Sequence, residues 1–61
     1  MDMTTEDVLK KALLDTQEKV RDFMHYTREV KDEELRTFFK EAAEEEGMQA
    51  RKLQQFLDDI H

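Results

Sequence analysis

Hydrophobic residues recur along the chain at alternating steps of three and four, the spacing that places side chains on one face of an α-helix. In the first half of the chain the pattern occupies Leu9, Leu13, Thr16, Val20, Phe23, Thr27 and Val30. The second half repeats the spacing at Leu35, Phe39, Ala42, Glu46, Gln49, Leu53, Phe56 and Ile60. The pattern therefore predicts two amphipathic helices.

Residues that cap helices stand just before each periodic segment. Thr4 and Asp7 have the spacing of a capping box, in which each side chain accepts a hydrogen bond from the other residue's backbone. Asp32 is placed to cap the second helix, and the two glutamates that follow it lie near the positive end of the helix dipole. The connection between the helices is therefore expected to be short.

These signals predict a helix over residues 5–30, a turn at 31–32 and a helix over 33–60. A connection this short makes the helices antiparallel, so we predict an all-α fold, a single helical hairpin over residues 1–61. The chain has no proline and one glycine, which fits long helices. That glycine, Gly47, indicates either a close approach of another backbone or a local kink.

A hairpin of this length is expected to need a partner, because short chains seldom bury enough apolar surface to fold alone. The apolar stripes are wider than one neighbouring helix covers, since they are flanked by Val8, Ala12, Met24, Tyr26, Phe38 and Leu57. Two hairpins related by a two-fold axis would form a four-helix bundle. The expected core of this homodimer contains Leu13, Val20, Phe23, Phe39, Ala42, Leu53 and Phe56. The alternative is a hairpin that docks through the same face on an unidentified protein partner.

Polar side chains interrupt the expected core at one level, where residues whose numbers sum to about 65 face each other across the hairpin. They are Thr16, Gln17, Glu46 and Gln49. One interpretation is a hydrogen-bonded layer that sets the register of the bundle. A second is a carboxylate metal site, with Glu46 as a ligand to iron or manganese. In a third, the second helix is rotated and Glu46 points outward.

Eight positions between Glu29 and Leu53 follow the order of an Asp-x-Glu-Leu turn, a phenylalanine and an Ala-x-x-Glu segment leading to a leucine. They are Asp32, Glu34, Leu35, Phe39, Ala43, Glu46, Ala50 and Leu53. In these positions the chain resembles the helix-turn-helix half of the rubrerythrin branch of the ferritin-like family. The resemblance implies half of a ferritin-like four-helix bundle, and a second copy of the chain would supply the other half.

The resemblance also implies that the metal ligands are largely lost. In the family, a Glu-x-x-His pair and a glutamate of the first helix hold a di-iron centre. Glu46 matches the first glutamate, but Gln49 stands in place of the histidine and Gln17 near the place of the second glutamate. Amide oxygen is a weak ligand for iron or manganese. This favours a non-catalytic structural protein without a cofactor; the alternative is an oxidoreductase module that binds iron or manganese at the dimer interface.

Composition excludes several other functions. The chain carries 16 acidic and 10 basic residues, a net charge of −6, and its basic residues alternate with acids along the first helix, so we expect no nucleic-acid binding. It contains neither serine nor cysteine, which excludes a serine or cysteine nucleophile. No segment approaches the ~20 apolar residues of a membrane span, and the beginning of the chain is acidic where a signal peptide is basic. We therefore expect a cytoplasmic protein that does not bind membranes.

Overall fold

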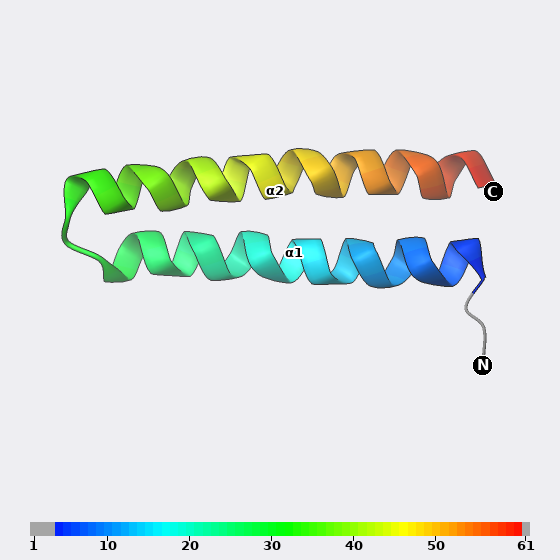
Figure 1. The fold of residues 1–61 in the computed structure, drawn as a ribbon, viewed down its shortest axis with the longest axis horizontal. Helices are drawn as coiled ribbons and strands as arrows, with labels where there is room; N and C mark the ends of the chain where they lie inside the picture. The colour runs from blue at the N-terminus through cyan, green and yellow to red at the C-terminus, as the bar shows by residue number, and fades with distance from the viewer. Residues whose placement is uncertain (1–3, 61) are drawn as a thin grey trace.

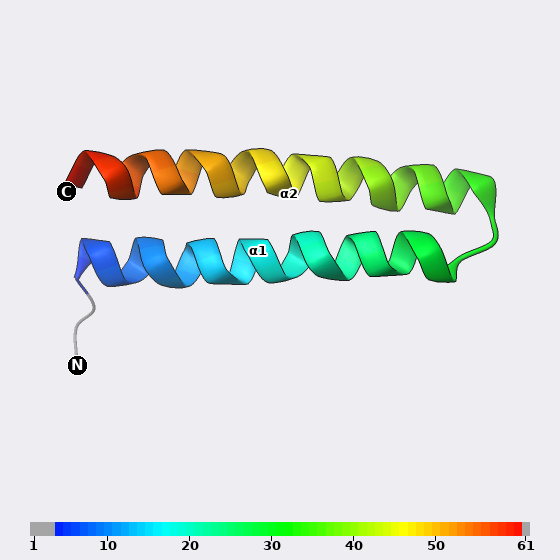
Figure 2. The same cartoon turned by 180° about the vertical axis from the view of Figure 1, so that it is seen from behind.

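Two long helices pack side by side in antiparallel orientation and are joined by a short connection (Figures 1 and 2). The computed structural model describes residues 4–60, so residues 1–3 and 61 of the predicted domain lie outside the described residues. Helix α1 spans Thr5–Glu29 and helix α2 spans Glu33–Ile60. The prediction of an all-helical chain with two packed helices is confirmed.

The hairpin is a single layer. Its Cα atoms extend over 43 × 24 × 11 Å, and the smallest dimension is close to the diameter of one helix. A stable domain usually packs two layers of secondary structure around one core. The described part of this chain supplies only one of them.

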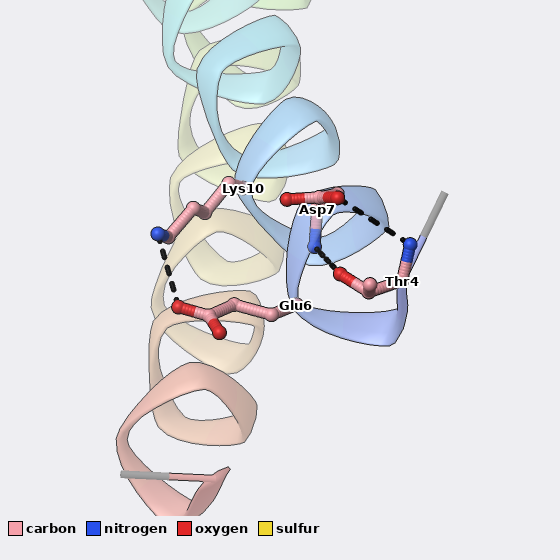
Figure 3. Close-up of polar contacts among 4 residues, drawn as sticks. All are labelled: Thr4, Glu6, Asp7 and Lys10. Atoms are coloured by element: carbon pink, nitrogen blue, oxygen red, sulfur yellow. Dashed lines mark hydrogen bonds and ion pairs between the residues drawn. The ribbon is translucent and has the colours of Figure 1, made fainter. Parts of the chain in front are cut away.

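The predicted capping box begins α1 (Figure 3). The hydroxyl oxygen of Thr4 accepts a hydrogen bond from the Asp7 backbone N–H at 3.1 Å, and the Asp7 carboxylate accepts one from the Thr4 N–H at 3.4 Å. One turn further along, Lys10 forms an ion pair with Glu6 at 3.0 Å. The two capping hydrogen bonds pair backbone donors that a helix start leaves without partners, and they explain why the helix begins at this position.

The connection spans residues 30–32, one residue more than predicted, because α1 ends at Glu29 and the backbone of Val30 is extended. The Asp32 carboxylate accepts a hydrogen bond from the Leu35 N–H at 2.8 Å, which confirms Asp32 as the cap of α2. The Arg36 guanidinium donates to the carbonyl oxygen of Val30 at 2.9 Å. This bond ties the first turn of α2 to the end of α1.

The contact between the helices is apolar and thin. Among the described residues, only Ala43 and Leu57 are buried. Near the connection, the Phe39 ring of α2 lies 6.0 Å from the Phe23 ring and 5.5 Å from the Tyr26 ring of α1, measured between centroids. Because a helix stripe is about 100° wide and each helix has only one neighbour, most apolar side chains stay partly exposed.

Gly47 lies within α2, and both views show that helix without a sharp bend (Figures 1 and 2). A Cβ atom at this position would meet nothing within 4 Å. The prediction of a close backbone approach is therefore wrong for the hairpin itself, because the space beside Gly47 is open.

Replacing Gly47 with alanine is expected to raise the free energy of unfolding by about 0.5–1 kcal/mol, since alanine loses less backbone entropy in a helix. Urea denaturation followed by circular dichroism measures the change. A Gln55→Gly substitution at an exposed position of α2 serves as the reverse control and should lower stability by a similar amount. A loss of stability in Gly47→Ala would instead mean that a second chain occupies the space beside Gly47.

Candidate functional site

The residues expected to form the dimer core mostly take part in the contact between the two helices of one chain. Six of the seven are half-buried in the hairpin, and these are Leu13, Val20, Phe23, Phe39, Ala42 and Leu53. The seventh, Phe56, is exposed. In the last turns of α2 the buried residue is Leu57, which directly follows Phe56. The helix contact therefore covers one side of the apolar stripe and leaves the side with Phe56 open.

The four polar residues of the expected layer divide between two environments. Thr16 and Glu46 are half-buried, whereas Gln17 and Gln49 are exposed. The Thr16 hydroxyl donates to the carbonyl oxygen of Ala12 at 2.7 Å, a bond within its own helix. Within residues 4–60 no hydrogen bond joins the four side chains to one another. A hydrogen-bonded layer at this level would need groups from a second chain.

Glu46 is a single half-buried carboxylate in the hairpin. Across the described residues, no three side chains of histidine, cysteine, aspartate or glutamate are grouped so that they could hold a metal ion. One carboxylate is too few ligands for iron or manganese, which take several carboxylate and imidazole donors in helical bundles. A metal site that includes Glu46 would therefore need ligands from another chain.

Replacing Glu46 with glutamine is expected to leave the free energy of unfolding unchanged or to raise it by up to about 1 kcal/mol. The carboxylate is partly removed from water and has no hydrogen-bond partner among residues 4–60, and a neutral amide of the same size loses less on burial. Thermal denaturation measures the effect, with exposed Glu44→Gln as the matched control. A clear loss of stability at Glu46 alone would show that its charge has a specific partner in the assembled protein.

Large apolar side chains gather on one open side of the hairpin, which we call the aromatic face. It contains Val8, Tyr26, Leu35, Phe38, Phe56 and Ile60, whose exposed fractions lie between 41 and 60%. Val8 and Tyr26 are 18 residues apart on α1, and Phe38 and Phe56 are 18 residues apart on α2. A separation of 18 residues is about five helical turns, so the members of each pair point in the same direction.

Contacts between the helices show that both halves of the aromatic face lie on the same side. At the open end of the hairpin, Leu9 of α1 lines one shallow apolar hollow together with Phe56 and Ile60 of α2. At the connection, the rings of Tyr26 and Phe38 both lie against the Phe39 ring, at 5.5 and 5.7 Å. The face thus has an apolar cluster at each end and extends along the whole hairpin.

In the sequence, Val8, Tyr26 and Phe38 stand out only as residues that widen the apolar stripes. The heptad pattern selects the residues nearest the axis of the stripe, and in a hairpin those residues pack on the other helix. The two 18-residue separations are the signal that could have identified the open face from the sequence.

No protein-family model matches this chain, and no curated protein and no solved structure matches it significantly. Within the described residues, no helix is both long and apolar enough to cross a lipid bilayer. The class of protein is therefore defined by the fold alone: a two-helix hairpin with an uncovered apolar face.

Proposed function

We propose that this protein is a structural or interaction protein that forms a homodimeric four-helix bundle and has no catalytic activity. The observation that carries the proposal is the thin core, since only Ala43 and Leu57 are buried among residues 4–60. A core of this size cannot offset the conformational entropy lost when 61 residues are ordered. A second copy would supply the missing layer of helices.

The exposed area of the hairpin supports this assembly. The hairpin exposes 5115 Å², whereas a compact monomer of 7.4 kDa exposes about 4,200 Å². A compact dimer of twice the mass would expose about 7,000 Å², which is about 3,200 Å² less than two separate hairpins. Obligate homodimers bury roughly 2,000–5,000 Å² in total, so a two-hairpin bundle lies within the range of stable dimers.

The resemblance to the rubrerythrin branch of the ferritin-like family agrees with a bundle of two hairpins. It also favours a protein without catalysis, because two of the three expected metal ligands of each half are replaced by Gln17 and Gln49. In this proposal Glu46 helps to set the register of the bundle together with Thr16 and Gln49. The cytoplasmic location stays a prediction from the sequence.

Native mass spectrometry of the full chain tests the proposal, before and after anaerobic incubation with Fe(II) or Mn(II). A dimer without bound metal is the expected result. A folded monomer at micromolar concentration would contradict the proposal.

The same experiment distinguishes the metal-binding alternative from a bundle without metal. A dimer that gains metal ions and loses them in Glu46→Ala would mean that the bundle is an iron or manganese module. Glu44→Ala, a change of the same kind at an exposed position, is the matched control for nonspecific binding to surface carboxylates.

A further inference from the structure

We infer that the two copies pack through the aromatic face and leave the opposite side of the hairpin in solvent. This inference rests on the proposed homodimer and adds the surface by which the dimer forms. The hairpin has two open sides, because each helix contacts only one neighbour (Figures 1 and 2). The arginines, all of which lie away from the aromatic face, indicate which of the two sides is covered.

The opposite side is marked by a shallow groove beside Gly47. Val20 and Met24 of α1 line this groove with Glu44, Gly47, Met48 and Arg51 of α2. Gly47 lies nine residues from both Phe38 and Phe56, which is about two and a half turns of helix. The groove and the aromatic face therefore lie on opposite sides of α2.

Basic side chains follow that opposite side along both helices. Four of them lie two residues from a member of the aromatic face, about 200° around the helix, and these are Lys10, Arg28, Arg36 and Lys40. The other two arginines, Arg21 and Arg51, lie five residues before Tyr26 and Phe56, about 140° around the helix. All four arginines of the chain thus lie away from the aromatic face.

Covering the basic side with a second copy would be costly. Four of its basic groups form no ion pair with any residue between 4 and 60, and these are Arg21, Arg28, Lys40 and Arg51. A second copy on this side would take these charged groups out of water, although acids such as Glu44 also lie there. Charged residues are depleted in the cores of protein interfaces for this reason.

The aromatic face is self-complementary. Near its middle it carries Lys19 on α1 and Glu45 on α2. The two lie at about the same level along the hairpin, because residues whose numbers sum to about 65 face each other, as Tyr26 and Phe39 do. With both connections at the same end of the bundle, Lys19 of one copy meets Glu45 of the other. With the connections at opposite ends, Lys19 meets Asp15 of the other copy, because the two lie equally far from the middle of α1. Either arrangement pairs opposite charges and places apolar clusters on apolar clusters.

Two glutamate variants of the full chain test the inference by sedimentation equilibrium. Phe38 is 60% exposed in the hairpin and lies on the aromatic face, whereas Met48 is 56% exposed and lies about 80° away around the same helix. Phe38→Glu is expected to weaken dimerisation at least 100-fold, and Met48→Glu to leave it within about threefold of the unchanged protein. Equal weakening by both variants, or weakening by Met48→Glu alone, would overturn the inference.

A second measurement does not depend on a disruptive variant. The chain has no cysteine, so a single one can be introduced at Val8 on the aromatic face or at Leu14, an exposed position elsewhere on α1. In the dimer, Val8→Cys is expected to react with a water-soluble thiol reagent at least tenfold more slowly than Leu14→Cys. Equal rates in a proven dimer would refute only the assignment of the aromatic face as the interface. If the protein without substitutions is a monomer, the proposed function is refuted as well.

Discussion

Replacing Leu57 with alanine is expected to lower the free energy of unfolding by about 2–5 kcal/mol. Leu57 is 5% exposed and is the only large side chain buried within residues 4–60. Its removal takes away apolar contacts between the open ends of the two helices and leaves a cavity. For a chain of 61 residues, total stability is about 3–9 kcal/mol, so this single change removes much of it.

Urea denaturation followed by far-ultraviolet circular dichroism measures the effect, at one fixed protein concentration because dimer stability depends on concentration. Leu14→Ala is the matched control, since Leu14 lies on the other helix with 66% of its surface exposed. We expect that control to change stability by less than about 0.5 kcal/mol. Equal effects of the two variants would show that Leu57 does not lie in the core of the folded protein.

Replacing Phe39 with alanine is expected to lower the free energy of unfolding by about 3 kcal/mol. This is close to the lower end of the range for core phenylalanines, because Phe39 is only half-buried in the hairpin. Its ring lies within 6.0 Å of the Phe23 ring and 5.5 Å of the Tyr26 ring, and these are the aromatic contacts that join the helices near the connection. Thermal denaturation at fixed concentration measures the loss.

Phe39→Leu separates the loss of buried apolar surface from the loss of ring contacts. Leucine keeps most of the apolar surface but cannot form ring contacts, which are worth about 0.5–1.5 kcal/mol beyond the area they bury. We therefore expect Phe39→Leu to cost about half as much as Phe39→Ala or less. A leucine variant as unstable as the alanine variant would mean that the geometry of the ring cluster holds this end of the hairpin together.

The two core positions lie 18 residues apart on α2, a distance of roughly 27 Å along the helix. Effects of substitutions so far apart usually add to within about 0.5 kcal/mol. The two substitutions therefore test the helix contact near each of its ends, with half-buried residues such as Val20 and Leu53 between them.

The helix boundaries could be predicted well because they depend on local chemistry. The capping box of Thr4 and Asp7 and the cap at Asp32 use side chains within three residues of the backbone groups they accept from. The one difference, the end of α1 at Glu29, concerns an extended residue, Val30, with no side-chain cap of its own. Helix ends of this kind are the least determined by local sequence.

Positions that depend on the neighbouring helix could not be predicted in the same way. Phe56 satisfies the heptad pattern as well as Leu53 does, but the first is exposed and the second is half-buried. Their side chains point about 60° apart on α2, and only the direction from which α1 approaches decides which of them it covers. The same holds for Gly47, where an added Cβ would meet nothing within 4 Å although Val20 and Met24 of α1 line the groove beside it.

The sequence by itself determined that this chain forms two long helices, where each begins and that they run antiparallel, because periodicity, caps and a short connection act within a few residues of one another. Only the tertiary structure decided how the apolar stripe is divided. It placed Leu57 and Ala43 in the contact between α1 and α2 and left Phe38 and Phe56 on an open face. The physical reason is that one helix covers only part of a stripe this wide, and the rotation of each helix about its own axis selects which part.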